Sequence, residues 1–216
     1  MATIKAFRAL RPRASDAKQV SCVPYDVVYE SEVRKFIASN SLSFLRVTRA
    51  EGEFPEENKP SVEEVFARAK QNLEWFISEN IYTADQEEAF YVYQLATETH
   101  TQTGVVGCCS IDEYEQGVIR KHENVRPDKV EDRTGHLLAV EAQTGLIFLA
   151  FRNTDTIRNL LADAVKGEPI YTFECPDGIR QKVWRLTETE PWRHRRPGEA
   201  RAAAIRRARA RRQVER

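Results

Sequence analysis

The strongest constraint on the fold is a run of helical periodicity that is followed by two segments rich in β-branched and aromatic residues. Apolar side chains recur at the 3.6-residue period in residues 61–78, on a face made by Val62, Val65, Phe66, Ala69, Leu73, Phe76 and Ile77. Ser61, with Glu64 three residues later, predicts a capping box at the start of this helix. Residues 89–95 and 104–111 then predict two strands that pair antiparallel across a polar connection. Helices and strands therefore share one chain.

The remaining segments alternate between strand and helix patterns in the same way. Strand patterns occur at residues 4–10, 43–48 and 146–151, and helix patterns at residues 31–39, at 155–165 and from Pro127 onward. A Pro-Asp-Gly turn at residues 176–178 predicts a hairpin of residues 170–175 and 179–186. The first fifty residues predict a β-α-β-like unit. The fold class predicted is α/β (α+β mixed), with a mixed, largely antiparallel sheet and packed helices in one domain, residues 1–190.

Charge is distributed unevenly, although the formal net charge of the chain is +0. Residues 193–216 contain ten arginines against Glu199 and Glu215, so they carry +8 and the rest of the chain carries −8. Residues 191–216 are therefore predicted to be a separate Arg/Ala-rich tail, either disordered or helical. Its composition is typical of a shifted reading frame in GC-rich DNA, and also of an arm that binds polyanions.

Two classes of protein are excluded by composition. The longest apolar run, residues 146–151, is too short to cross a bilayer, and the amino terminus lacks the apolar core of a signal peptide. The chain is therefore predicted to be cytoplasmic and to have no membrane partner. Its four cysteines, Cys22, Cys108, Cys109 and Cys175, lack C-x-x-C spacing, so no metal site is predicted and the thiols are expected to be reduced packing residues.

The densest polar segment, residues 121–133, is the first candidate functional site. If Pro127 begins a helix, the N–H groups of its first turn point toward the loop that carries His122, Glu123, Asn124 and Arg126, and this geometry can hold an anion. Further along the helix, Lys129 and Arg133 lie one turn apart, and acidic residues lie beside them. Basic side chains can hold phosphate while carboxylates hold a metal or take a proton. The alternative is a solvated helix face whose acidic residues offset the helix dipole.

A second candidate is the segment Val-Pro-Tyr-Asp at residues 23–26. Pro24 biases Val23 toward an extended conformation, so that Tyr25 and Asp26 can face a cleft. The alternative here is a simple turn. Elsewhere, residues 104–107 lack the lysine and the serine or threonine of a phosphate-binding P-loop, and the chain has no G-x-G-x-x-G string. Rossmann and Walker nucleotide sites are therefore disfavoured.

Eight stretches of the chain together resemble a known family. They are IKAFRALRP (4–12), VPYDVV (23–28), SFLRV (43–47), YVYQL (91–95), QTGVVG (102–107), residues 112–133, QTGLIF (143–148) and VWRL (183–186). The most specific is the string His-Glu-Asn-x-Arg-Pro-Asp-Lys-x-x-Asp-Arg at residues 122–133. These stretches resemble the bacterial and archaeal proteins of domain of unknown function family 1015, over its amino-terminal half only.

The resemblance implies an activity only through a motif of the longer family members, and this chain lacks that motif. Full members look about twice as long and carry a later Ala-Asp-Gly-His-His-Arg-like motif, which is similar to one in the ParB, sulfiredoxin and free-serine-kinase group. The resemblance implies the amino-terminal part of a nucleotide-dependent phosphotransferase that acts on a small metabolite such as serine, with ATP or ADP and Mg²⁺. Thr134-Gly135-His136-Leu137 is not a substitute for the missing motif. We therefore expect the chain to be truncated, and inactive or incomplete alone.

The candidate residues of the two segments can be divided by role. The candidate catalytic residues are His122, Glu123, Glu131 and Asp132, and the candidate substrate- or phosphate-binding residues are Asn124, Arg126, Lys129, Arg133, Tyr25 and Asp26. Two other functions stay open. One is a non-catalytic interaction domain or fragment, and the other is non-specific nucleic-acid binding through the arginine tail.

Overall fold

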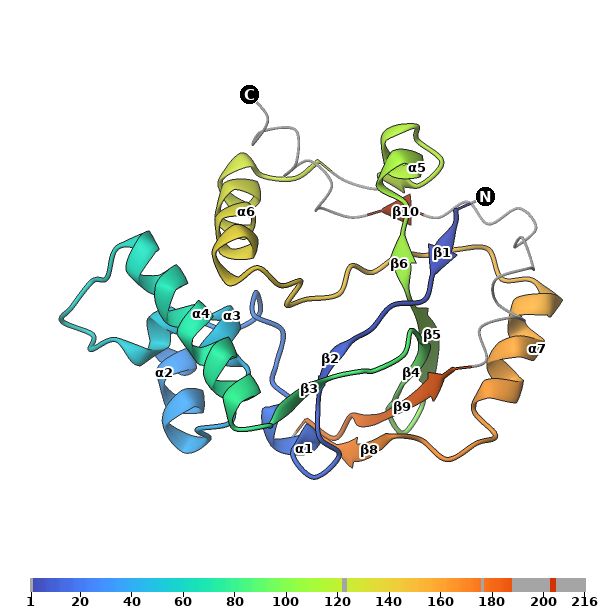
Figure 1. Ribbon diagram of the computed structural model, residues 1–216, viewed down its shortest axis with the longest axis horizontal. Helices are drawn as coiled ribbons and strands as arrows, with labels where there is room; N and C mark the ends of the chain where they lie inside the picture. The colour runs from blue at the N-terminus through green and yellow to red at the C-terminus, as the bar shows by residue number, and fades with distance from the viewer. Residues whose placement is uncertain (1, 122–123, 176, 188–202, 205–216) are drawn as a thin grey trace. The chain divides into compact units, whose positions relative to one another are not determined.

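The chain passes back and forth between two units, neither of which is a continuous stretch of sequence. The computed structural model describes residues 2–121, 124–175, 177–187 and 203–204. Unit 1 contains residues 1–10, 84–126 and 147–216, and unit 2 contains residues 11–83 and 127–146. The chain leaves unit 1 within β2 (Leu10–Pro12) and re-enters it within β3 (Tyr82–Ala84), and these two strands pair with each other (Figure 1).

Unit 1 is built on a four-stranded sheet in the order β5-β4-β9-β8. Its strands are β4 (Phe90–Ala96), β5 (Thr101–Val106), β8 (Tyr171–Glu174) and β9 (Arg180–Leu186). Every neighbouring pair is antiparallel, and central Tyr91 pairs with Val106 on one side and Arg185 on the other. Both hairpins predicted from the sequence, β4 with β5 and β8 with β9, are confirmed. The mixed α/β class with antiparallel sheets is confirmed as well.

The other elements of unit 1 are short, apart from one helix. They are β1 (Ile4–Lys5), β6 (Cys108–Cys109), α5 (Ile111–Glu115), β7 (Arg120–Lys121), α7 (Asp155–Ala164) and β10 (Ala203–Ala204). β1 pairs antiparallel with β6, and β7 pairs parallel with β10. Burial raises the pKa of the Cys109 thiol. Helix α7 confirms the helix predicted from the sequence, and the side chain of Thr154 caps it by accepting from the Ile157 N–H.

A buried polar network crosses the sheet of unit 1. The side chain of Asp85 is 5% exposed and accepts a hydrogen bond from the Tyr91 hydroxyl and one of 3.2 Å from Arg185 Nε. Arg185 Nη2 also donates to the Glu87 carbonyl oxygen at 3.0 Å. The pKa of Tyr91 is raised, first by burial and then by the adjacent Asp85 carboxylate. This network links the segment before β4 to strands β4 and β9.

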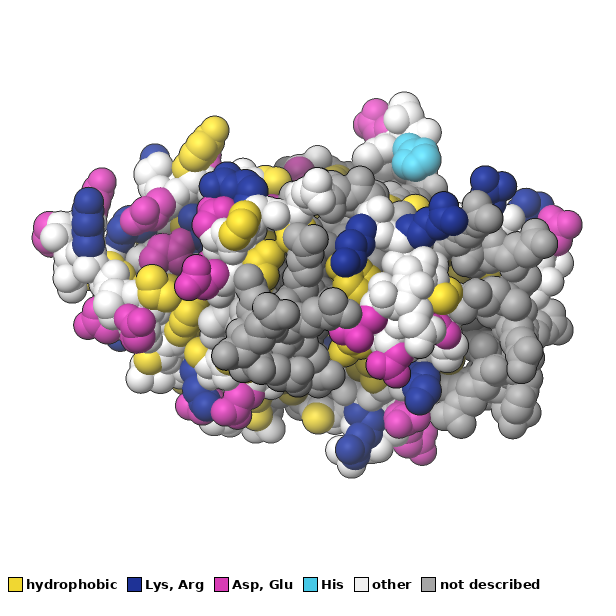
Figure 2. All heavy atoms as spheres, turned by 90° about the horizontal axis from the view of Figure 1, so that it is seen from above, with side chains coloured by type: hydrophobic (Ala, Val, Ile, Leu, Met, Phe, Trp, Pro, Cys, Tyr) yellow, Lys and Arg dark blue, Asp and Glu magenta, His cyan; other side chains and the backbone are white. Residues whose placement is uncertain are grey.

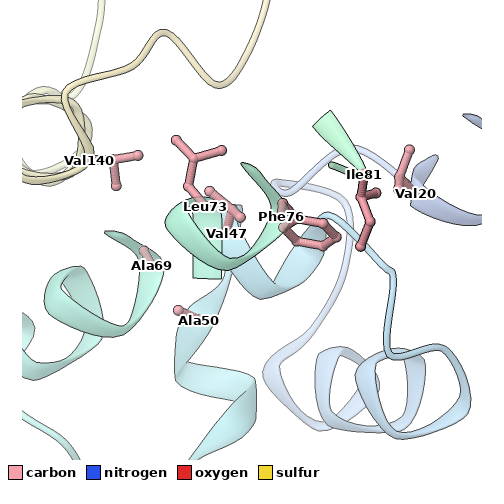
Figure 3. Close-up of a cluster of buried hydrophobic side chains, with 8 residues drawn as sticks. All are labelled: Val20, Val47, Ala50, Ala69, Leu73, Phe76, Ile81 and Val140. Atoms are coloured by element: carbon pink, nitrogen blue, oxygen red, sulfur yellow. The ribbon is translucent and has the colours of Figure 1, made fainter. Parts of the chain in front are cut away.

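Unit 2 is helical. Its elements are α1 (Ala17–Val20), α2 (Glu30–Ser39), α3 (Leu45–Thr48), the 3₁₀ helix η1 (Ala50–Glu53), α4 (Val62–Ser78) and α6 (Pro127–Val140). The predicted capping box of α4 is confirmed, because Ser61 Oγ accepts from the Glu64 N–H at 3.2 Å and Glu64 Oε2 accepts from the Ser61 N–H at 2.7 Å. The core is a cluster of buried side chains from four α-helices, the 3₁₀ helix and the segment after α4: Val20, Val47, Ala50, Ala69, Leu73, Phe76, Ile81 and Val140 (Figure 3).

The strand predicted for residues 43–48 is wrong, and so is the β-α-β-like unit. Residues Leu45–Thr48 form helix α3, in which Leu45, Val47 and Thr48 are all buried. Burial on more than one side is possible because α4 and η1 both pack against α3. Arg46 remains partly exposed and forms an ion pair with Glu53. Tertiary packing thus overrides a segment whose alternating residues resemble a strand.

The strand predicted for residues 146–151 is also wrong. Residues 146–149 have no regular structure, and Ala150 forms an isolated bridge. Leu146 is 66% exposed and Phe148 62% exposed, and of this apolar run Leu149 packs against buried Ile119. A strand needs a neighbour for its backbone N–H and C=O groups, and apolar composition alone does not supply one.

The remaining predictions on organisation are tested only in part. Of the described helices, none is long and apolar enough to span a bilayer. The predicted boundary at residue 190 and nearly all of the arginine tail lie outside the described residues, so the tail stays a prediction. Basic and acidic side chains are interspersed over the face drawn in Figure 2.

Candidate functional site

The polar segment predicted as a site is divided between the two units. His122 and Glu123 lie outside the described residues. Asn124 and Arg126 are exposed and belong to unit 1, whereas α6 belongs to unit 2 and begins at Pro127, the start that the sequence predicts. Within unit 2, the candidate site consists of α6 and the residues that contact it.

The first turns of α6 present charged side chains to solvent. Lys129 and Glu131 are exposed, and neither has a hydrogen bond or ion pair with another described residue. The opposite side of the helix is apolar or aromatic in character, with Val130, His136 and Val140 buried. The exposure of Lys129 and Glu131 is compatible with both interpretations of the segment: a helix face that contacts only solvent, and side chains that are accessible to a ligand.

Arg133 and Tyr25, which the sequence singles out separately, lie against each other. The Arg133 Cζ atom is 4.5 Å from the centroid of the Tyr25 ring, within the range of a cation–π contact. Arg133 Nε and Nη2 each lie 2.7 Å from Asp132 Oδ2. The Arg133 side chain is only 18% exposed. Among the described residues, no acceptor contacts its remaining nitrogen, Nη1, so this fixed guanidinium retains unused donors.

The backbone beside Tyr25 is held by an arginine that the sequence prediction missed. Arg49 Nη1 donates to the carbonyl oxygens of Tyr25 at 2.6 Å and Val28 at 2.9 Å. Arg49 Nε donates to Glu51. The side chain of Arg49 is 18% exposed, and the residue lies at the junction between α3 and η1. No spacing or motif marks it, because its partners are backbone carbonyls more than twenty residues earlier in the chain.

Residues 24–28 form a turn, as one of the two interpretations of the Val-Pro-Tyr-Asp segment expected. The Val27 N–H donates to the Pro24 carbonyl oxygen at 3.2 Å. Tyr25 is half-buried and Asp26 is exposed. The turn and a binding role are compatible, since the turn is what presents the Tyr25 ring to Arg133.

His136, on α6, has a structural position. Its Nε2 lies 2.8 Å from the Val47 carbonyl oxygen, and its ring meets the Phe66 ring edge-on at 5.9 Å between centroids. Neighbouring Gly135 allows this packing, because a Cβ there would lie 2.6 Å from Phe66 Cε2. His136 and Gly135 thus fix α6 against α3 and α4, and they hold the helix that carries Arg133.

Comparison with known proteins assigns the family. The family model described as a protein of unknown function, DUF1015, matches residues 4–195. The chain belongs to this family. No curated protein and no solved structure matches this chain.

The matched range of DUF1015 includes Tyr25, Arg49 and Arg133 together with the whole polar segment 122–133. The family description assigns no activity. The proposed similarity of full members to the ParB, sulfiredoxin and free-serine-kinase group stays a prediction.

The charges of this DUF1015 site limit what it can bind. Around Tyr25 and the first two turns of α6, cations are outnumbered by carboxylates: Lys129, Arg49 and Arg133 against Asp26, Glu51, Asp128, Glu131 and Asp132. A bare polyanion is disfavoured by such a balance, whereas a phosphate neutralised by a divalent cation is not. In the described part of the chain, no group of three His, Cys, Asp or Glu side chains could hold a metal alone. Mg²⁺ commonly needs only one or two carboxylates when phosphates complete its coordination, and exposed Glu131 fits that mode.

Proposed function

We propose that this DUF1015 chain carries the phosphate-binding, amino-terminal part of a nucleotide-dependent phosphotransferase that acts on a small metabolite such as serine. The observation that supports this function best is the Arg133 guanidinium, which Asp132 and the Tyr25 ring hold in place while no described residue accepts a hydrogen bond from Nη1. A planar guanidinium fixed before binding is well suited to phosphate, because less side-chain entropy is lost when the hydrogen bonds form.

The neighbouring residues would assist Arg133 in distinct ways. Lys129, one helical turn earlier, adds a second positive charge next to the phosphate. Mg²⁺, when bound with the nucleotide, supplies charge neutralisation, and Glu131 is the described carboxylate open to it. His122 and Glu123 remain the candidates for accepting a proton from a substrate hydroxyl. Asp26 is the candidate substrate contact within unit 2, and Asn124 and Arg126 remain candidate binding residues predicted from the sequence.

Binding of ATP or ADP with Mg²⁺ should raise the melting temperature of the wild-type chain, and Arg133→Ala should remove most of that increase. Ligand at about 100 times its Kd stabilises a protein by about 2.7 kcal/mol. Loss of a charge-assisted hydrogen bond costs about 1.5–3 kcal/mol, which is roughly a 10- to 100-fold weaker affinity. Differential scanning fluorimetry with inorganic phosphate, ADP and ATP, each with and without Mg²⁺, is the measurement.

Two further variants make this test specific. Arg158→Ala, in α7, removes an exposed ion pair with Asp155 and should leave the nucleotide response unchanged. Arg133→Lys keeps the charge but loses the planar fork, so it should bind more weakly than the wild type even if it folds equally well. A wild-type melting temperature that no phosphate-containing ligand changes would overturn the proposal.

A second candidate function rests on the arginine tail. Ten arginines in residues 193–216, with no aromatic residue after Trp192, favour contacts with phosphate backbones and offer no stacking platform for bases. Deletion of residues 193–216 should therefore weaken binding to DNA of any sequence. The deletion should also reduce the steepness with which the logarithm of the DNA-binding constant falls with the logarithm of the salt concentration. Because the tail carries a net charge of +8, this change in slope should be at most about 7. Equal affinity with and without the tail in a salt titration by fluorescence anisotropy rules this function out. If neither ligand class binds, a non-catalytic interaction domain is the remaining alternative.

A further inference from the structure

Arg49 makes contacts that a surface arginine does not need. A single nitrogen, Nη1, donates to two carbonyl oxygens of the turn that carries Tyr25, at 2.6 Å and 2.9 Å. The opposite edge of the guanidinium is held by Glu51 through Nε. The side chain is 18% exposed, so these hydrogen bonds operate with reduced solvent competition. Among the described residues, the turn itself contains one backbone hydrogen bond, from the Val27 N–H to the Pro24 carbonyl oxygen. Arg49 is thus a principal restraint on its backbone.

The restraint extends to Arg133 through Tyr25. Arg49 fixes the Tyr25 carbonyl, the Tyr25 ring lies 4.5 Å from Arg133 Cζ, and Asp132 holds the same guanidinium from its other side. Glu51, Arg49, Tyr25, Arg133 and Asp132 therefore form one continuous series of contacts within unit 2. A shift of the turn backbone would move the ring on which Arg133 lies.

We infer that Arg49 is a positioning residue for the proposed phosphate site: by holding the turn of Tyr25, it sets the orientation of the Arg133 donors from which no described residue accepts. The expected effect of Arg49 on phosphate binding rests on the proposed function, whereas its effect on the position of Arg133 does not depend on any ligand. Lysine cannot replace Arg49, because one ammonium group cannot bind Glu51 along one edge and both carbonyls at another.

The ring current of Tyr25 provides a signature of this positioning in the protein alone. Side-chain NMR of arginine Nε–H groups should show Arg133 displaced from the other arginines, with its signal identified by its absence in Arg133→Lys. Tyr25→Leu, which removes the ring, defines the undisplaced position, and Tyr25→Phe should keep the displacement. Arg49→Lys should move the Arg133 signal toward the Tyr25→Leu position and weaken binding of MgATP about tenfold.

The matched control is Arg46→Lys. Arg46 is 20% exposed, lies in α3 and forms an ion pair with Glu53, so it resembles Arg49 in burial and pairing but does not contact the turn. Its substitution should lower stability without moving the Arg133 signal. If Arg49→Lys does not fold, Glu51→Gln, which loosens Arg49 in place, should produce a smaller displacement in the same direction.

The outcomes separate this inference from the proposed function. An Arg133 signal that stays at its wild-type position in both Arg49→Lys and Glu51→Gln overturns the positioning role, whatever MgATP does. A displacement that Arg49→Lys removes, in a protein whose wild type binds no phosphate ligand, supports the positioning role and overturns the proposed function.

Discussion

Phe76→Ala is expected to destabilise unit 2 by about 3–5 kcal/mol, the largest effect of any single substitution considered for that unit. Phe76 is fully buried in the cluster of Figure 3, and its ring lies 5.2 Å from the Trp75 ring and 5.6 Å from the Tyr82 ring, between centroids. Truncation removes the transfer free energy of the ring and leaves a cavity between helices that are held by the chain and relax only in part.

The measurement is a thermal or urea unfolding curve, in which the transition that includes unit 2 should move down by at least about 10 °C. Ile77→Ala is the matched control, because Ile77 is the next residue of α4 and is 43% exposed. We expect a loss under about 1 kcal/mol from the control. Equal losses from the two substitutions would contradict the core assigned here.

Asp85→Ala should destabilise unit 1 by about 3–5 kcal/mol. The substitution leaves the partly buried Arg185 guanidinium without its carboxylate and the Tyr91 hydroxyl without its acceptor. The cost arises mainly from these unpaired partners rather than from the lost pair itself. Because β4 and β9 carry the partners, the loss should appear across the sheet.

A double-mutant cycle of Asp85→Ala with Tyr91→Phe measures how the two groups depend on each other by chemical denaturation. Asp163→Ala, which removes an exposed pair with Lys166, is the control and should change stability by no more than about 0.5 kcal/mol. The raised pKa of Tyr91 adds a pH effect. The contribution of Tyr91 is complete below its ordinary pKa of 10.0 and is lost as pH rises above it, so Tyr91→Phe should flatten that alkaline decline. Additive losses from the two substitutions would contradict a shared network.

The elements that were predicted correctly are those marked by sequence patterns within the element itself or at its ends. Helix α4 combines periodicity with a capping box, α6 begins at a proline, and β8 and β9 meet at a Pro-Asp-Gly turn. Residues 43–48 and 146–151 failed for opposite reasons. The first is helical because neighbouring helices bury it on several sides, and the second has a single bridge residue, Ala150, despite its apolar residues. Neither property can be predicted from the residues of the segment alone, because both depend on tertiary contacts.

The candidate site was predictable as separate residues but not as an arrangement. Tyr25 and Arg133 were each singled out from the sequence, yet their contact depends on how α6 packs within unit 2. Arg49 could not be found, since hydrogen bonds to backbone carbonyls leave no pattern of side-chain types. The roles of His122 and Glu123 remain predictions from the family resemblance.

The strand order of unit 1 has a consequence for how the protein is made. Central strand β4 pairs with β5, which follows it almost at once, and with β9, which begins at Arg180. At synthesis rates of about 5–20 residues per second, the ribosome needs several seconds to reach β9 after completing β4. During that time the strand that contains Phe90, Tyr91 and Val92, which are buried in the folded chain, has one unpaired edge at which another extended segment could pair.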